Sequence, residues 1–545
     1  MKTLMKKNKL NINYLFFVTC LLLTFGACTS GFDEINRKVD DATEEELGYD
    51  LLGVGSLITQ IQSQIYPSIT KAQNLDVNNY QKMFNLAGDV YSGHQGATSN
   101  FDNNGRNNTT YNMIPDWYSV AYNVAFQNYM NPWYSLLNKK GISPSAFAVG
   151  QILKVFGMHR ITDMYGPIPY KDFFPASEVP FTPQDVVYDL FFEELDEAIA
   201  ILEDFINNNP GAKPMAAYDW VYEGDYEKWI KFANSLKLLL AIRIVYADEG
   251  KAKQKAEEAI TGGVFLSNAD NAMLQVNGTS TINPLHMICH LYDDTRLGAT
   301  MESYLKGYND PRLPLLFNPS KVSGVNRDYN GVRSGISMDP DAYTVCSELN
   351  VTASTSIQFM AAAEVYFLRA EAALRGWNAG GTAKDLYEEG IRTAFDQPIG
   401  GGQGKAGDAT DYIAGTTKPQ PYKDPINSSY NYPETGDVSV KWEESLSQDK
   451  LLEKIITQKW IALFPDGQEA WSEFRRTGCP RVIPIDGNVS GGNIDVKKQI
   501  ARLPYPDELK GDYPELYNEA LKLLNGADTG GIKLWWDKRT NKPYQ

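Results

Sequence analysis

The sequence FMAAAEVYFLRAEAALRGW, residues 359–377, indicates the fold class of this chain. Its apolar residues recur every three or four positions, which places them on one face of an α-helix. A short Asn/Gly turn follows, and then a second stretch of helical period, AKDLYEEGIRTAF, at 383–395. Thr382 lies three residues before Asp385, the spacing of a helix N-cap. These residues predict two successive helices joined by a tight turn.

A second pair of the same kind is predicted from 227–246 (EKWIKFANSLKLLLAIRIVY) and 251–261. Alanine and glycine at close-contact positions, with aromatic residues between them, resemble the helical unit of tetratricopeptide repeats, although the spacing is too irregular for a regular array. Further amphipathic stretches occupy 186–206 and 450–463, and Ser143-Pro144 and Thr182-Pro183 are helix-start signals. We therefore expect a mainly all-α protein, a right-handed scaffold of tetratricopeptide-like helix pairs.

Three long segments interrupt the helical pattern, near residues 86–115, 268–358 and 396–447. They are rich in Gly, Asn, Ser, Pro and Tyr and show no helical period. Loops of this length are usually either functional or disordered, and their many aromatic residues argue against disorder. We expect a single helical domain over residues 46–545 that carries these insertions on one face.

The N-terminus has the pattern of an export signal. A lysine-rich start is followed by the apolar run LFFVTCLLLTF at 15–25 and by the small residues Gly26 and Ala27. The run is too short to span a bilayer, which takes about 20 residues. Cys28 comes next, and this arrangement resembles the lipobox of bacterial lipoproteins, which implies a signal peptide at 1–27 and lipid attachment at Cys28. Polar residues 28–45 then predict a flexible leash, with the first helix starting near the Thr43–Glu46 capping box.

Charge and cysteine content limit the possible partners. The formal net charge is −16, and loss of the four signal-peptide lysines takes it to −20. Such a surface repels nucleic acid and anionic lipid headgroups. We therefore expect no nucleic-acid partner, and we expect the lipid to be the only attachment to the membrane. Cys20 is lost with the signal peptide, and Cys28 is used for lipid attachment. The three other cysteines, Cys289, Cys346 and Cys479, are odd in number and too few for a disulfide framework, so the core must hold the fold.

Catalytic motifs receive no positive support. His286 and His290 have the spacing of a zinc-binding helix, and Cys289 is a possible soft ligand, but the glutamate of that motif is missing. A partly buried helix is the favoured interpretation, so no metal ligand or cofactor is assigned, and bound calcium is left open. Glu364 and Glu371 lie two turns apart on one predicted helix, close to arginines, which favours structural salt bridges. A glycoside hydrolase that uses two carboxylates remains an alternative.

Binding chemistry is better represented. A sugar ring offers an apolar face and a rim of hydroxyls, so sugar sites combine flat aromatic side chains with Asn, Asp or Arg groups. Residues 86–118 contain this mixture, and the second insertion contains it again. The candidate ligand-binding residues are Tyr91, His94, Phe101, Arg106, Asn107, Trp117, Tyr118, Tyr292, Arg296 and Tyr343.

Several segments read together resemble the SusD/RagB-like outer-membrane lipoproteins of Bacteroidetes nutrient-uptake systems. They span nearly the whole mature chain and include FDEIN at 32–36, RITDMYGPIPY at 160–170, GD at 224–225 with KW at 228–229 and FANSL at 232–236, DPRLP at 310–314, AEVYFLRAEA at 363–372, EKIITQKWIALFPDGQEAWSEFRRTGCP at 453–480 and RLPYP at 502–506.

The resemblance implies a non-catalytic binding protein on the outside of the outer membrane, which captures oligosaccharides for a TonB-dependent SusC-like transporter. A peptide ligand is the alternative within the same family. The resemblance also implies that Trp229, Trp471 and the pair Arg475-Arg476 pack or bridge helices. Because family members bind ligands through variable loops, no ligand residue is carried over by motif, and the aromatic candidates rest on their chemistry alone.

Overall fold

Paired helices make up most of the structure, a computed structural model that describes residues 51–69, 75–101, 107–175, 178–324, 328–339, 341–397 and 405–544. Residues 54–545 form one compact unit, and residues 1–53 are assigned to another. Cys28, the signal peptide, the leash and the predicted start of the first helix lie outside the described residues.

The described α-helices are α4 (Leu52–Ile65), α5 (Leu75–Tyr80), α6 (Pro115–Tyr118), α7 (Val120–Ala125), α8 (Asn131–Leu137), α9 (Pro144–Tyr165), α10 (Gln184–Asn208), α11 (Tyr226–Arg243), α12 (Glu249–Gly262), α13 (Pro284–His290), α14 (Ala299–Gly307), α15 (Leu313–Leu316), α16 (Ala362–Leu374), α17 (Ala383–Asp396), α18 (Thr410–Ile413), α19 (Gln448–Leu463), α20 (Gly467–Thr477), α21 (Asp507–Asp512) and α22 (Pro514–Leu524). Two π-helices, η1 (Gln81–Asp89) and η3 (Phe126–Met130), and two 3₁₀ helices, η2 (Asn108–Thr110) and η4 (Ser428–Tyr430), complete the helical part. The strands are β1 (Gln95–Ala97), β2 (Ala272–Leu274), β3 (Thr295–Leu297) and β4 (Ile357–Met360), in the antiparallel pairs β1–β3 and β2–β4.

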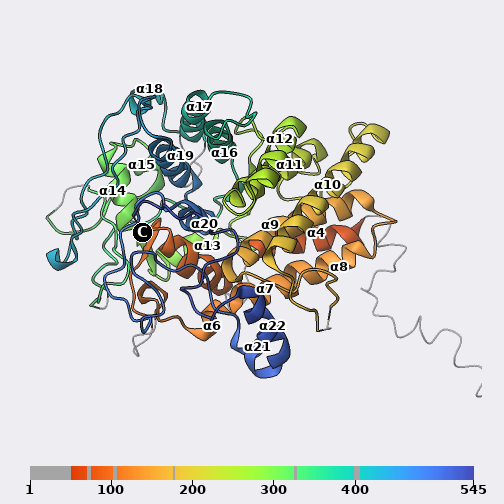
Figure 1. Ribbon diagram of the computed structural model, residues 1–545, viewed down its shortest axis with the longest axis horizontal. Coiled ribbons are helices and arrows are strands. Elements are labelled where there is room, and N and C mark those ends of the chain that lie inside the picture. The colour runs from red at the N-terminus through yellow and green to blue at the C-terminus, as the bar shows by residue number, and fades with distance from the viewer. Residues whose placement is uncertain are drawn as a thin grey trace, which may run out of the picture. The chain divides into compact units, whose positions relative to one another are not determined.

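Both helix pairs predicted from the sequence are confirmed, α11 with α12 and α16 with α17, and α9 packs against α10 in the same way (Figure 1). Thr382 caps α17, because its side-chain oxygen accepts a hydrogen bond from Asp385 N at 3.1 Å. The partners in a pair approach closely where glycine meets an aromatic ring. A Cβ on Gly390 of α17 would lie 2.8 Å from the Phe367 ring of α16. The small residues therefore set the spacing within this pair.

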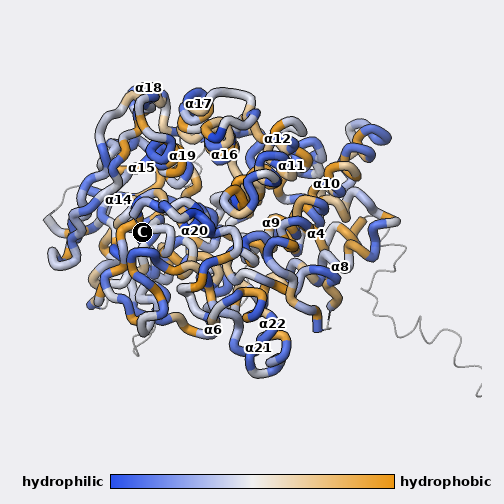
Figure 2. Tube along the Cα trace, viewed as in Figure 1, coloured by the Kyte–Doolittle hydropathy of each residue, from blue (hydrophilic) through white to orange (hydrophobic). Residues whose placement is uncertain are grey.

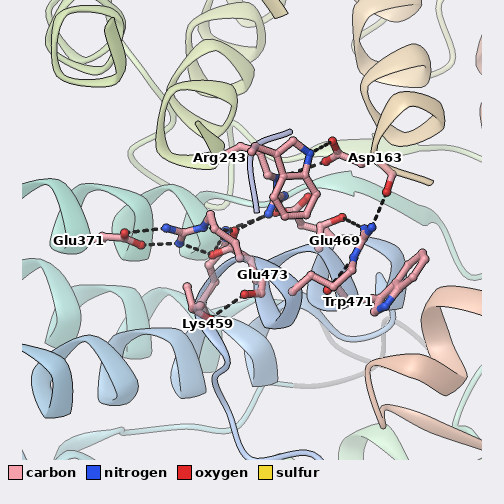
Figure 3. Close-up of polar contacts among 12 residues, drawn as sticks. Asp163, Arg243, Glu371, Lys459, Glu469, Trp471 and Glu473 are labelled. Carbon is pink, nitrogen blue, oxygen red and sulfur yellow. Dashed lines mark hydrogen bonds and ion pairs between the residues drawn. The ribbon is translucent and has the colours of Figure 1, made fainter. Parts of the chain in front are cut away.

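A network of buried charges joins five helices around α20 (Figure 3). Arg243 of α11 forms ion pairs with Glu469 and Glu473 of α20 at 2.5 and 2.6 Å, and with Asp163 of α9 at 3.2 Å. Arg476 of α20 pairs with Glu371 of α16 at 2.6 Å. These side chains are at most 2% exposed. Several partners per charge offset the cost of taking ions out of water.

The fifth helix of the network is α19, whose Lys459 lies 3.4 Å from Glu364 of α16 and from Glu473. Burial would raise the pKa of Glu473, but Arg476, Lys459 and Arg243 hold that pKa well below its usual value. Arg475 donates to Asp163 O and stacks on the Trp471 ring, 3.6 Å from its centre. The structural roles predicted for Glu364 and Glu371, and for the Arg475-Arg476 pair, are thus confirmed.

Tryptophans fill the core between these helices. Trp229, Trp460, Trp471 and Trp536 are among the largest fully buried side chains. Trp229 donates from Nε1 to Asp219 Oδ2 at 2.7 Å, and Trp471 donates to Ile500 O at 3.1 Å. Each indole therefore buries its apolar area while its N–H is satisfied, which is the condition for a tryptophan to stabilise a core.

The second insertion contains more helix than its sequence indicates. It holds α13, α14 and α15, although no helical period was evident there. Gly298 precedes α14 and offers no side-chain cap, so the sequence lacks a start signal at this point. Asn283 caps the start of α13, because Asn283 Oδ1 accepts a hydrogen bond from Leu285 N.

No helix in the described ranges is both long enough and apolar enough to cross a membrane. Figure 2 shows apolar and polar residues interspersed along the helices. In α17 the buried residues recur every three or four positions, as expected for a helix with one face packed inward and the other in water.

Candidate functional site

The three insertions meet in one surface region, which we call the insertion surface. Strand β1 of the first insertion pairs with β3 of the second, Gly96 opposite Arg296. Asn100 of the first donates to Met338 O of the second at 3.0 Å. Tyr422 of the third insertion donates to Gly331 O of the second, also at 3.0 Å. Segments far apart in the sequence are therefore held together by hydrogen bonds.

The insertions have a small apolar core of their own, built from Val332, Ile336, Met338, Tyr343 and Cys346. Asp424 organises the neighbouring part of the third insertion. Its carboxylate accepts hydrogen bonds from the hydroxyls of Tyr343 and Tyr422, at 2.9 and 3.0 Å, and from the backbone N–H of Ile426 and Asn427. The described parts of the insertions are thus ordered, as the aromatic content predicts.

Six of the candidate ligand residues lie in the interior. These are Tyr91, His94, Asn107, Tyr118, Arg296 and Tyr343. His94 is fully buried, with Nε2 2.8 Å from Trp460 O, and burial lowers its pKa to about 4. Because a carbonyl oxygen can only accept, Nε2 carries the proton of a neutral imidazole. Tyr91 packs on Trp471, with ring centres 5.2 Å apart.

The other interior candidates also contact protein groups. Arg296 donates to Cys289 O and Thr344 O and pairs with Asp293 at 2.6 Å. Tyr118 donates to Asp507 Oδ1 at 3.0 Å. All six side chains are therefore buried among other protein groups.

Three candidates remain partly exposed: Phe101, Trp117 and Tyr292. Phe101 and Trp117 meet edge to face, with ring centres 5.4 Å apart and planes at 85°. Asn107, next to this pair, donates to Ser99 O at 3.3 Å, and Ser99 Oγ accepts from Phe101 N. These bonds hold the chain that carries Phe101. Arg106 lies outside the described residues.

Two further aromatic residues belong to the same surface. Tyr430 and Tyr432 of the third insertion are half-buried. Tyr430 donates to Ser337 O at 3.0 Å, and the Arg333 guanidinium lies 5.2 Å from the centre of the Tyr432 ring. The alternation Tyr-Asn-Tyr in that insertion is a signal by which sequence reasoning could have found them.

The histidine pair on α13 makes local contacts. Ring nitrogens of His286 and His290 lie 3.4 and 3.1 Å from Val351 O. Cys289 is buried, its sulfur accepts from Leu349 N, and burial raises its pKa to about 11. In the parts of the chain that the structure describes, no group of three or more His, Cys, Asp or Glu side chains could hold a metal ion.

Paired helices that carry ordered loops with partly exposed aromatic side chains form a scaffold suited to ligand binding. The family model "Susd and RagB outer membrane lipoprotein" matches residues 34–537. The chain belongs to this SusD-like family, whose members are non-catalytic binding proteins. No curated protein sequence matches the chain.

Solved structures agree with this assignment. A chitin-binding SusD homologue from Flavobacterium johnsoniae is 37% identical, with a TM-score of 0.83, and the match covers 90% of this chain and 100% of that chain. A SusD homologue from Bacteroides thetaiotaomicron is 36% identical, with a TM-score of 0.81, and one from Bacteroides vulgatus is 34% identical, with a TM-score of 0.83. Both matches cover 90% of this chain and 99% of the other.

Proposed function

We propose that this protein binds an oligosaccharide at the insertion surface and delivers it, unmodified, to a partner TonB-dependent SusC-like transporter. The observation that carries the proposal is the edge-to-face pair of Phe101 and Trp117, partly exposed where the insertions meet. A partly exposed indole supplies the flat apolar face on which a sugar ring stacks. In such sites, polar side chains such as Asn or Arg bind the hydroxyls at the rim of the ring.

Chito-oligosaccharides are the first ligands to test, because the Flavobacterium homologue that is 37% identical is described as chitin-binding. In the proposed mechanism, lipid on Cys28 tethers the protein to the outer face of the outer membrane. The insertion surface then covers both the bound ligand and the mouth of the transporter. Two-step capture of this kind needs binding without covalent chemistry, as in the rest of the family.

Calorimetry with the mature protein tests the ligand assignment. Trp117→Ala should weaken binding of chitohexaose at least about tenfold, which is about 1.4 kcal/mol. The matched control is Phe174→Ala, because Phe174 is a surface aromatic, 56% exposed, outside the three insertions. Equal affinity of the Trp117 variant and the wild type would place the site elsewhere.

Assays on the same samples distinguish the alternative functions. Binding of peptides without any glycan would favour a peptide-binding member of the family, and release of reducing ends would indicate a glycoside hydrolase.

Co-purification of a β-barrel partner from detergent-solubilised membranes tests the proposed transporter partner. Antibody labelling of intact cells tests the outward orientation.

A further inference from the structure

A cavity of about 60 Å³ lies between the end of η1, the start of α20 and strand β4. It opens to the outside beside the half-buried residues Met273, Thr355 and Ser356. One water needs about 10–15 Å³ of such space, so the cavity has room for roughly four to six water-sized species. A small ligand and part of its hydration shell would fit.

Unpartnered polar atoms are concentrated in this cavity. Tyr66 Oη, Gln397 Oε1 and both amide atoms of Gln468 have no hydrogen-bond partner in the described part of the chain. The three side chains are buried, 3%, 6% and 1% exposed. The opposite end of the Gln397 amide is fixed, because its Nε2 donates to Gln358 Oε1 at 2.6 Å. Buried polar groups are nearly always satisfied, so four such atoms in one cavity indicate a bound species.

The charge of the cavity wall indicates the sign of that species. Asp89 and Asp466 both line the cavity, and Arg160 neutralises Asp466 through two hydrogen bonds of 2.9 and 2.7 Å. The donors to Asp89 are neutral groups: Gln95 Nε2 at 2.9 Å, Gly467 N at 3.1 Å and the Asn85 side chain. Among the described side chains, no Lys, Arg or His forms an ion pair with Asp89. The wall therefore carries one uncompensated negative charge when Asp89 is ionised.

The donor atoms indicate the kind of cation. Carboxylate, amide and hydroxyl oxygens are ligands of hard cations, and the described residues that line the cavity include no His or Cys that would favour a transition metal. Calcium sites gain affinity from several carboxylates, whereas a net charge of one matches a monovalent ion. Burial and the neighbouring Asp466 raise the pKa of Asp89 when it has no cation, and a bound cation would oppose that rise.

We propose that this cavity binds a monovalent cation, Na⁺ or K⁺, through Asp89 and the neutral oxygens of Gln468, Gln397 and Tyr66. Asp89 is the last residue of η1, and the chain continues from it to β1 and Phe101. A cation there would fix the base of the first insertion. The proposal does not depend on the identity of the carbohydrate ligand.

Thermal unfolding of the mature protein tests the site, in NaCl, KCl, CaCl₂ or choline chloride at one ionic strength. Na⁺ or K⁺ should raise the Tm by about 1–2 °C over choline for the wild type. Asp89→Asn and Gln468→Met should each lose this ion-specific difference. Asp294→Asn, the control, should keep it, because Asp294 accepts from Gln81 of the same η1 helix but does not line the cavity.

A crystal grown in RbCl provides a second measurement, independent of stability. An anomalous peak within bonding distance of Asp89 would support the site, even if a variant fails to fold. Equal Tm values in all four salts with no anomalous peak would overturn the proposal and leave ordered water as the occupant. Stabilisation by Ca²⁺ alone would overturn the monovalent assignment.

Discussion

His94 lies in the core, where its ring contacts Trp460 and Phe464 at centre distances of 4.9 and 5.7 Å. Residue type and loop position made it a candidate ligand group. Its burial is set by α19, which follows more than 350 residues later in the chain. Trp117 has the same aromatic chemistry but remains partly exposed. Local sequence therefore predicted which side chains could bind a sugar, but not which of them face solvent.

Substitution of His94 should change stability and leave glycan affinity intact. Burial lowers the pKa of His94 from 6.5 to about 4, so its contribution to stability is complete above pH 6.5 and is lost as pH falls through 4. His94→Gln should lower the free energy of unfolding at pH 7.5 by about 1–3 kcal/mol. It should also flatten the decline between pH 6.5 and 4. Urea unfolding at several pH values measures both effects. Weaker glycan binding, with an unchanged pH dependence of the free energy of unfolding, would contradict the structural role assigned to the buried His94.

At the scale of helices, the periodic stretches were predicted with nearly correct bounds, because amphipathic period and capping residues are local properties. The stretch 450–463, for example, corresponds to α19 (Gln448–Leu463). Helix α14 was missed, because Gly298 gives it no capping side chain. The partners of Glu371 could not be assigned fully either. Arg375 lies one turn away on the same helix, but Arg476 lies 105 residues further along the chain.

The buried charge network should be sensitive to loss of a single carboxylate. Glu371→Gln leaves the Arg476 guanidinium with one ionic partner, Glu473, and should destabilise the protein by about 3–5 kcal/mol. The control is Glu197→Gln, which breaks the Lys140–Glu197 pair, whose side chains are 39% and 42% exposed, and should cost less than about 1 kcal/mol. Chemical denaturation compares them. Similar losses for both variants would mean that the network does not hold the helices together.

The approach of α20 to η1 should depend on Gly467. A Cβ there would lie 2.3 Å from Asp89 Cα, a backbone atom that cannot move aside cheaply. Gly467→Ala should therefore lower the free energy of unfolding by about 1–3 kcal/mol. Gly250→Ala, near the start of α12, meets only Asp248 Oδ1 at 3.7 Å and should be neutral or stabilising by up to about 1 kcal/mol. A neutral result at Gly467 would show that the two helices can separate.

The whole molecule combines a helical scaffold with insertions that are separated in sequence but joined by hydrogen bonds. The periodic stretches and the family motifs predicted the scaffold. Pairings such as Gly96 with Arg296, and Tyr422 with Gly331, depend on how the complete chain folds, so no local pattern indicated them. The proposed attachment to the membrane depends on Cys28, which lies outside the described residues.

Replacement of Cys28 tests that attachment. Without its thiol the chain cannot be acylated, so Cys28→Ser should move the protein from the outer-membrane fraction to the soluble fraction. Membrane affinity rises by about 0.8 kcal/mol per buried CH₂, so the loss of acyl chains should abolish retention. Detergent phase partitioning of wild type and variant measures the change. Retention of the serine variant in the membrane would require a different anchor.

The central claim is that the insertion surface holds an oligosaccharide without cleaving it. The most direct test incubates the purified mature protein with chitohexaose and measures, in the same sample, bound glycan and new reducing ends. The account predicts saturable binding that Trp117→Ala weakens, with no reducing ends above the protein-free control. Reducing ends that increase with protein concentration would contradict it.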